Sequence, residues 1–397
     1  MPKELCFINA KVVTPQNVIN GYVIVKDGII KEVGEGTLNH ISKVNGNCHI
    51  EDMENDYLIP GLVELHTDNL EKHLEPRAGV LWSSSRNAFL AHDAQLAAAG
   101  MTTVLDSLSV GEYHSKKQRS KMLEMSIQAL NEVREHKGTR VNHYLHLRCE
   151  VSDPQMPELF NALISEPDLR LVSLMDHTPG QRQFANEENY RTYYQSSFQW
   201  TDEEFQERVV ELKEIQKHYA KKHEAQIIAF CRQNNIILAS HDDACTSHID
   251  DAISAGIKIS EFPTTMQAAK YAVDKGLLTI MGSPNIMRGG SHSGNISALA
   301  VAKENALCIL SSDYAPHSLL PAAFILYEEN VFDLPTAINL ITKNPAEAVG
   351  LNDRGEILQG KKADLVRVAC NQKQTNDSYP YQLPEVRTVW NNGIRVI

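Results

Sequence analysis

A histidine and a carboxylate follow a short apolar stretch near the start of the chain. The stretch, residues 58–65, contains a Pro-Gly pair and leads directly into His66-Thr67-Asp68. Side chains two residues apart on a strand point to the same side, so His66 and Asp68 would converge. An imidazole and a carboxylate that converge can hold a divalent metal ion. A buried strand that turns polar as it leaves the core would look the same, so this pair alone does not decide the chemistry.

Four more apolar stretches end in an imidazole or a carboxylate. These ends are Glu150, His177, His241 and Asp313. One histidine after a strand is more often a hydrogen-bonded residue of the core or its rim, but that explanation does not account for five such ends in one chain. The neighbouring Asp242 and Asp243 are expected to be solvated or to lie behind the ligands.

Three histidines together with carboxylates suit Zn²⁺ or a related first-row ion such as Mn²⁺ or Fe²⁺. Two ions ~3.5–4 Å apart could generate a hydroxide near neutral pH and neutralise the oxygens of a displaced group. We therefore expect one or two divalent ions, with Zn²⁺ as the first choice. The candidate ligands are His66, Asp68, Glu150, His177, His241 and Asp313.

Alternating strands and helices between residues 57 and 349 would bring these strand ends together. The predicted strands are residues 58–65, 101–106, 141–150, 169–177, 236–241, 257–262, 277–283 and 307–313. The predicted helices include residues 87–99, 116–136 and 202–234, the last with a capping box at Thr201 and Glu204. Repeated strand–helix units with apolar strands form parallel sheets, and eight of them close a (β/α)8 barrel of the TIM type. The active site of such a barrel lies where the strands end.

Both ends of the chain resemble short β-strands in their composition. Asp27-Gly28 and Asn392-Gly393 each stand between β-rich runs, which is a hairpin signal. Neither end carries enough apolar surface to fold alone, so we predict one small β-sandwich domain built from residues 1–56 and 350–397. The valines expected to meet in its core are Val23 or Val25 from one end and Val366 or Val368 from the other.

The composition limits the class of protein. The 397 residues are 42% hydrophobic and 22% charged, and the formal net charge of -12 argues against a general nucleic-acid binder. The seven cysteines are scattered without a C-x-x-C pair, so we expect reduced thiols in a cytoplasmic protein. No apolar run approaches the ~20 residues of a membrane span, and the N-terminal residues lack an apolar signal region. We expect a homo-oligomer, most simply a dimer.

The strand ends, on a barrel beside a split β domain, resemble the amidohydrolase superfamily. Its members usually carry His-x-His after the first strand, a bridging carboxylated Lys or Glu, one His on each of two further strands and an Asp after the last. The resemblance implies that Glu150 bridges two ions and that His177 and His241 hold the second. It also implies that Asp313 is the catalytic base that takes the proton from water. Asp68 departs from the pattern, because it stands where the second histidine is usual.

Longer blocks resemble, more narrowly, the amidohydrolases of the carbon–phosphorus lyase pathway. The blocks are residues 66–77 (HTDNLEKHLEPR), 146–150 (HLRCE), 176–182 (DHTPGQR), 240–243 (SHDD) and 281–295 (MGSPNIMRGGSHSGN). This resemblance implies hydrolysis of a ribose 1-alkylphosphonate 5-triphosphate to the 5-phosphate and diphosphate. It also implies a functional link to other proteins of that pathway.

Such a substrate is heavily anionic, so an acidic protein must gather cations at its site. The candidate substrate-binding residues follow strand ends or lie in the loops beyond them: Lys72, His73, Arg77, Arg148, Arg182, Arg288, Ser291 and His292. The Gly-rich loop Arg288–Gly294 could wrap an anion with backbone N–H groups. We expect this loop and the group Lys72, His73 and Arg77 to take the β- and γ-phosphates.

Two other functions remain open on the sequence. One is a C–N hydrolase of the same superfamily that opens a cyclic amide or deaminates a purine, although a neutral ring needs no cluster of cations. The other is a metal-free scaffold, although such scaffolds lose ligand residues and here every ligand role is filled.

Overall fold

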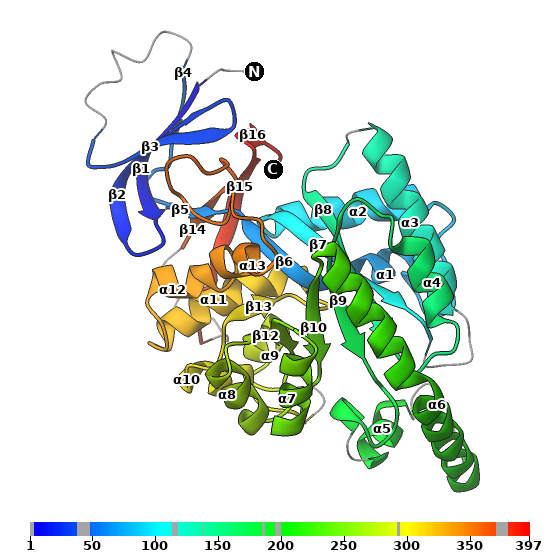
Figure 1. Ribbon diagram of the computed structural model, residues 1–397. Coiled ribbons are helices and arrows are strands. Elements are labelled where there is room, and N and C mark those ends of the chain that lie inside the picture. Colours follow the sequence, from blue (N-terminus) through cyan, green and yellow to red (C-terminus); the bar gives the residue numbers. More distant parts are fainter. Residues whose placement is uncertain are drawn as a thin grey trace.

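The computed structural model describes residues 4–37, 48–112, 118–136, 138–184, 187–194, 200–291, 294–370 and 380–397. Within these residues the chain forms two sheets, one of which is surrounded by helices (Figure 1). This sheet is a parallel barrel built from the middle of the chain. The other sheet combines strands from both ends of the chain.

Eight parallel strands form the barrel, and each pairs with its neighbour in sequence. They are β6 (Leu62–Thr67), β7 (Met101–Val110), β8 (Asn142–Glu150), β9 (Leu169–Met175), β10 (Ile237–His241), β11 (Ile259–Glu261), β12 (Leu278–Gly282) and β13 (Ile309–Ser311). The predicted (β/α)8 barrel is therefore confirmed, with β7 four residues longer at its end than residues 101–106.

The first and last strands meet at the carboxyl end of the barrel. There Thr67 and Asp313 form a parallel bridge, and the Asp313 N–H donates to the His66 carbonyl at 3.0 Å. Farther from that end, residues 340–341 link the two strands, because the Val63 N–H donates to the Ile341 carbonyl at 2.9 Å and the Leu310 N–H to the Leu340 carbonyl at 3.0 Å. This near-closure places Asp313 directly beside His66.

Alternate positions on the strands fill the interior of the barrel. The buried side chains that meet there include Val63, Leu65, Leu105, Leu171, Ala239, Ile259, Ile280 and Ile309. The outer faces pack against helices, so every residue of β7 is buried. Burial on both faces explains why the strands are rich in apolar residues.

Helices connect the strands and surround the barrel (Figure 1). They are α1 (Asn69–Leu74), α2 (Ser85–Ala98), α3 (Gln118–His136), α4 (Met156–Leu163), α5 (Glu187–Tyr194), α6 (Asp202–Asn234), α7 (Thr246–Ser254), α8 (Met266–Asp274), α9 (Ser283–Met287), α10 (Ala298–Lys303), α11 (Leu319–Glu328), α12 (Leu334–Asn339) and α13 (Lys343–Ala348). In the described part of the chain, none of them combines the length and apolar character that crossing a membrane requires.

The long helix α6 has the bounds and the cap that the sequence predicts. The Thr201 hydroxyl accepts from the Glu204 N–H at 3.2 Å, and the Glu204 carboxylate accepts from the Thr201 N–H at 2.8 Å. Together with α5, one end of α6 projects from the barrel (Figure 1). The aromatic side chains that hold this projection together are Phe184, Tyr190, Tyr194, Trp200 and Phe205.

Strands from both termini share the second sheet, as predicted. They are β1 (Glu4–Val13), β2 (Val18–Lys26), β3 (Ile29–Glu35), β4 (Cys48–Asp52), β5 (Tyr57–Pro60), β14 (Leu365–Ala369), β15 (Glu385–Asn391) and β16 (Ile394–Arg395). Their order is β16-β15-β14-β5-β1-β2-β3, with β4 also paired to β1. The sheet curls on itself, because Phe7 of β1 and Trp390 of β15 meet edge to face with ring centroids 4.9 Å apart. Residues 57–60, expected at the start of the barrel, pair in this sheet instead.

The predicted partners in the terminal core are off by one residue. Val23 and Val25 lie in that core with Leu365, whereas Val366 and Val368 pack on the side of the barrel. Successive side chains of a strand point to opposite faces, so a shift of one residue exchanges the two sides. The expectation for Val366 and Val368 is therefore wrong, although the shared core exists.

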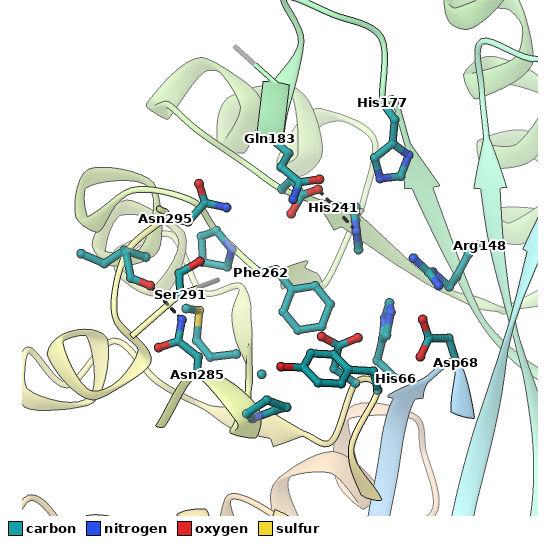
Figure 2. A pocket seen from close by; sticks show the side chains of 18 of the residues that line it. His66, Asp68, Arg148, His177, Gln183, His241, Phe262, Asn285, Ser291 and Asn295 are labelled. Atoms are coloured by element: carbon teal, nitrogen blue, oxygen red, sulfur yellow. Dashed lines mark hydrogen bonds and ion pairs between the residues drawn. The ribbon is translucent and has the colours of Figure 1, made fainter. Parts of the chain in front are cut away.

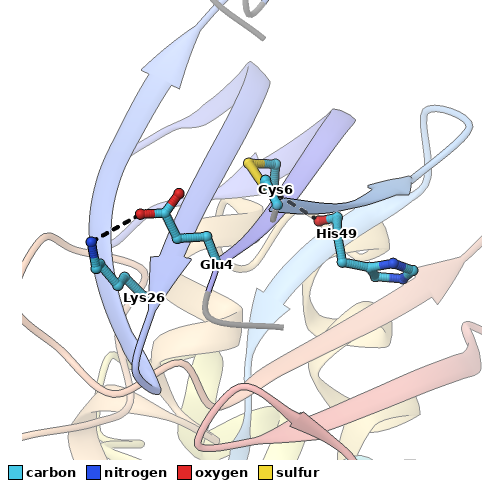
Figure 3. The surroundings of a disulfide bond; sticks show 5 residues. Glu4, Cys6, Lys26 and His49 are labelled. Carbon is cyan, nitrogen blue, oxygen red and sulfur yellow. Dashed lines mark hydrogen bonds and ion pairs between the residues drawn. A yellow bond between two sulfur atoms is a disulfide. The ribbon is translucent and has the colours of Figure 1, made fainter. Parts of the chain in front are cut away.

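A disulfide bond joins Cys6 of β1 to Cys48 of β4 (Figure 3). The two strands pair in parallel, which brings the cysteines together although 42 positions separate them in sequence. On the other side of β1, Lys26 forms an ion pair with Glu4 at 3.0 Å. The prediction that all cysteines are reduced is wrong for this pair. The free cysteines are Cys149, Cys231, Cys245, Cys308 and Cys370.

Candidate active site

A cavity of about 220 Å³ lies at the carboxyl ends of the barrel strands (Figure 2). Eight of the site residues expected from the sequence line it: His66, Asp68, Arg148, His177, His241, Arg288, Ser291 and Asp313. These residues come from strands and loops throughout the barrel, and the fold alone brings them together.

Three imidazoles face this cavity side by side. The rings of His66 and His241 stack with centroids 5.6 Å apart, and those of His241 and His177 lie 5.9 Å apart. Asp242 adds a carboxylate oxygen 3.5 Å from Nε2 of His241. Potential ligand atoms of His177, His241 and Asp242 all lie within 4.8 Å of one another, and all three residues are buried. Asp242 is therefore buried and not solvated, which excludes one of the two alternatives expected from the sequence; a position behind the ligands stays a prediction.

Two buried carboxylates fix the orientation of these imidazoles. Glu150 accepts from Nδ1 of His177 at 2.6 Å. Glu261 binds Nδ1 of His66 at 3.0 Å through one oxygen and Nδ1 of His241 at 3.2 Å through the other. In each ring, Nε2 is then the nitrogen left for a ligand, which is how carboxylates usually orient metal-binding histidines. Although burial opposes ionisation, the imidazoles hold the pKa of Glu261 well below its usual value.

Glu150 is not among the residues that line the cavity. Its second oxygen accepts from the Ser152 hydroxyl at 2.9 Å and from the His177 N–H at 3.1 Å. In this arrangement Glu150 supports His177 from behind. Its bridging of two metal ions stays a prediction.

Glu261 was missed by the sequence analysis, although it lies within the predicted strand 257–262. It occupies the end of β11, and the strand-end criterion that selects His241 and Asp313 would also have selected Glu261.

Several strand ends at the cavity hold an uncommon backbone conformation. Asp242, Phe262 and Asp313 all have positive φ, at 55°, 52° and 51°. Residues other than glycine seldom adopt this region, and such strain concentrates at functional sites. At Asp313 the conformation follows from near-closure of the barrel, where Thr67 donates its hydroxyl to the Asp313 carbonyl at 2.7 Å.

Glu64 supports the same junction from inside the barrel. Its carboxylate accepts from the His66 N–H at 2.7 Å and from the Ser312 N–H at 2.6 Å, so it spans the first and last strands. Burial raises the pKa of Glu64 to about 8. One side chain thus positions the backbone of both a histidine and the segment that carries Asp313.

Two buried polar atoms at the cavity have no hydrogen-bond partner among the described residues: Oδ1 of Asp68 and Nε of Arg148. Figure 2 shows both side chains beside His66. A buried charged group without a partner is costly. The pair therefore suits a site where Asp68 meets a cation and Arg148 meets an anion.

The other predicted basic residues lie farther out. Lys72 donates to the Tyr314 carbonyl and lies over the Tyr314 ring, which itself lines the cavity. His73 bonds to the Gln95 side chain at 2.8 Å, and Arg77 is exposed. Substrate contacts of these residues stay predictions.

Arg182 is engaged within the protein. Its guanidinium donates to the Asp243 carboxylate at 2.7 Å and to the His241 carbonyl at 2.9 Å, so it supports the loop after β10. His292 lies outside the described residues. Contacts of Arg182 and His292 with substrate stay predictions.

The structure adds lining residues that the sequence analysis did not select. They include Arg119, Gln183, Tyr194, Phe262, Asn285 and Asn295. Arg119 lies near the start of α3, and Tyr194 ends α5, so only tertiary packing brings them to the cavity.

Comparison with known proteins agrees with this geometry. Residues 194–396 match the model of the Amidohydrolase family. Over 360 residues, the chain is 43% identical to alpha-D-ribose 1-methylphosphonate 5-triphosphate diphosphatase of Escherichia coli (strain K12). That alignment covers 90% of this chain and 93% of the relative. The chain belongs to the amidohydrolase family. Amidohydrolases are metal-dependent, and the buried His177–His241–Asp242 group and the unpartnered oxygen of Asp68 fit a divalent ion.

Other solved structures share the fold. Molinate hydrolase superposes with a TM-score of 0.66 at 14% identity, over 99% of this chain and 94% of its own. N-acetylglucosamine-6-phosphate deacetylase from Pasteurella multocida gives a TM-score of 0.59 at 14% identity, over 99% of both chains. These similarities support the barrel with its split terminal domain and carry no information on the substrate.

Proposed function

We propose that this protein hydrolyses α-D-ribose 1-alkylphosphonate 5-triphosphate to the 5-phosphate and diphosphate, in the breakdown of alkylphosphonates. The observation that carries this proposal is the identity of 43%, over nine-tenths of the chain, to a relative named for that activity. The cavity supports it independently. It combines a histidine–carboxylate cluster with guanidinium groups, Arg148 and Arg288, that make no hydrogen bond or ion pair with residues the structure describes.

The histidine-rich donor set favours Zn²⁺, with Mn²⁺ or Fe²⁺ as alternatives. The side chains that would hold the metal are His66, Asp68, His177, His241, Asp242 and Asp313, all of which line the cavity. Glu150 would join them only by giving up its hydrogen bonds to His177. When bound, a divalent ion would lower the pKa of a water molecule and neutralise charge on phosphoryl oxygens.

Asp313 is the proposed catalytic base. The water oxygen forms a bond to one phosphorus of the α–β bridge, and the bond from that phosphorus to the bridging oxygen breaks. Asp313 takes a proton from the water and returns it to the departing group. Arg148, Arg288 and Ser291 hold the anionic substrate in place, because charge-assisted hydrogen bonds to phosphoryl oxygens are strong and directional.

We also propose that the protein works in the cytoplasm as a homodimer, with other proteins of the carbon–phosphorus lyase pathway. We further propose that the two ends of the chain form one composite β domain beside the barrel. The curled terminal sheet, which combines strands from both ends, supports this division.

Product analysis tests the reaction. The metal-loaded protein, given ribose 1-methylphosphonate 5-triphosphate, should release diphosphate, which ³¹P NMR distinguishes from orthophosphate. Asp313→Asn should lower kcat by about 10²–10⁴, the usual contribution of a general base, while at least one metal ion per chain remains. Asp274→Asn, on the exposed end of α8, is the matched control and should keep the wild-type rate. Release of orthophosphate, or turnover of cyclic amides alone, would contradict the proposal.

A further inference from the structure

The cavity has two chemically different ends. Figure 2 shows Asp68 and Arg148 beside His66 at one end. Asn285, Ser291 and Asn295 lie at the other, across the ring of Phe262. The histidine cluster lies at the first end, so this end is nearer to the proposed metal ligands than the other end is.

Guanidinium groups dominate the end beside the histidines. Arg148 comes from β8, and its side chain lies beside those of His66 and Asp68 (Figure 2). Arg119 lines the same cavity from α3 and donates to the Ser109 hydroxyl at 3.3 Å. Ser109 in turn donates to the partly buried Glu71 carboxylate at 3.2 Å. Ser109 of β7 pairs in register with Arg148 of β8, so the Arg119 guanidinium reaches the strand position next to Arg148. Arg148 thus lies beside His66, and Arg119 adds a second cation on the same side of the cavity.

The side chains that Figure 2 labels at the opposite end are polar and uncharged, and the one cation considered there is Arg288. The amide of Asn285 is fixed, since it donates to the Ile296 carbonyl at 3.1 Å and accepts from the Ala298 N–H at 2.9 Å. Arg288 follows at the C-terminal cap of α9. In the part of the chain that the structure describes, its guanidinium has no hydrogen bond or ion pair. Arg288 therefore lines the cavity from the same segment of chain as Asn285 and Ser291.

The substrate of the proposed function has the same asymmetry. On one side of the broken α–β bridge, the charges of the diphosphate are contiguous. On the other side, an uncharged ribose separates the α-phosphate from the phosphonate on C1. A cation that binds the diphosphate must therefore lie next to the reacting phosphorus. A cation that binds the phosphonate must lie about the length of one ribose away from that phosphorus.

We infer that the Arg148–Arg119 end binds the departing diphosphate, and that the end with Asn285, Ser291 and Arg288 binds the ribose and its phosphonate. This orientation rests on the proposed function. It reverses the expectation from the sequence, which gave the β- and γ-phosphates to the loop that begins at Arg288. Arg119 thereby becomes a substrate-binding residue that no sequence motif indicates.

Pairs of variants and substrates test the orientation. The substrates are the 1-methylphosphonate 5-triphosphate and methyl riboside 5-triphosphate, which lacks the phosphonate. Arg288→Gln should lower kcat/KM about 10- to 100-fold on the first, the usual worth of a hydrogen bond between charged groups, and less than threefold on the second. Arg119→Gln should lower kcat/KM on both substrates by the same factor. Arg86→Gln, an exposed arginine on α2, is the matched control and should change neither.

Product inhibition gives a second measurement that does not depend on turnover of an analogue. Inhibition by diphosphate should weaken at least tenfold in Arg119→Gln and stay unchanged in Arg288→Gln, with metal content equal in all variants. If Arg288→Gln instead weakened diphosphate inhibition, or impaired both triphosphates equally, the assigned orientation would be wrong. If the wild-type protein released no diphosphate from either triphosphate, the proposed function itself would be wrong. That outcome differs from a wrong orientation, in which the wild-type protein still releases diphosphate.

Discussion

Some side chains at this site act by holding neighbouring residues in position and not only by binding a ligand. Glu261 is the clearest case, because one carboxylate binds the Nδ1 atoms of His66 and His241 and also accepts from the Ser173 hydroxyl at 2.6 Å. Glu261→Gln should keep the size of the side chain but remove the charge and one of the acceptors. We expect metal affinity to fall about 10- to 100-fold, as for other groups that orient metal-binding histidines, with little change in the fold. Competition with a chelator measures the affinity, and circular dichroism checks the fold.

Glu304→Gln is a matched control for that experiment. Glu304 is half-exposed and pairs with Lys270 at the surface, so its replacement should leave the metal affinity unchanged. Equal affinity in wild type and Glu261→Gln would show that the imidazoles are held by packing alone.

Residue types and strand ends predicted eight of the residues that line the cavity, but not their partners. Arg148 and Arg182 both come shortly after a histidine, His146 and His177 respectively, and looked equivalent in the sequence. In the structure Arg182 is bound to Asp243, whereas Nε of Arg148 has no hydrogen-bond partner among the described residues. Which carboxylate an arginine meets depends on contacts between distant segments, and no local pattern encodes that.

At the scale of elements, a buried chain of polar groups ties α2 to β7 and β8. His92 binds one oxygen of Asp106 at 2.8 Å, and His143 binds the other at 2.7 Å. His143 also lies 3.3 Å from the Asp93 carboxylate. This network explains why β7 continues past Asp106, where the sequence analysis ended the strand. The carboxylate is fully paired inside the fold and has no need to reach solvent.

The network predicts how stability depends on pH. Burial alone would lower the pKa of His143, but Asp106 and Asp93 raise it to about 9. Because the folded pKa exceeds the unfolded value of about 6.5, this stabilisation is complete below pH ~6.5 and is lost as pH rises through about 9. His143→Gln should be less stable than wild type by about 3–5 kcal/mol at pH 6.5, and the difference should shrink towards pH 9.5. Urea unfolding at several pH values measures it.

His218→Gln provides the comparison, because His218 is exposed on α6 and should leave the pH dependence unchanged. A gap between wild type and His143→Gln that stayed constant from pH 6.5 to 9.5 would mean that His143 is neutral in the folded protein.

For the whole molecule, the alternation of apolar stretches and turns was enough to predict the barrel and the pairing of the two termini. The strands are rich in apolar residues because both of their faces are covered, although β8 also carries several polar side chains. The register of the terminal strands was not predictable, since Leu365 and Val366 are equally apolar and a shift of one residue exchanges the faces. The Cys6–Cys48 bond was missed for a similar reason, because it depends on which strands pair.

Strand β15 connects the two cores, and this connection makes a prediction about cooperativity. Val389 lies in the barrel core and the adjacent Trp390 in the terminal core, so neither core can lose β15 alone. Trp390→Ala should destabilise the protein by about 3–5 kcal/mol. The remaining tryptophans, Trp82 and Trp200, both belong to the barrel part of the chain, so their fluorescence reports on the barrel only. The fluorescence and the circular dichroism of Trp390→Ala should therefore report the same unfolding temperature, and it should be lower than that of the wild type.

Trp82→Ala, which removes a side chain that is 48% exposed, should change the free energy of unfolding by no more than about 0.5 kcal/mol. A barrel signal that kept its wild-type midpoint in Trp390→Ala would mean that the terminal sheet folds as an independent unit.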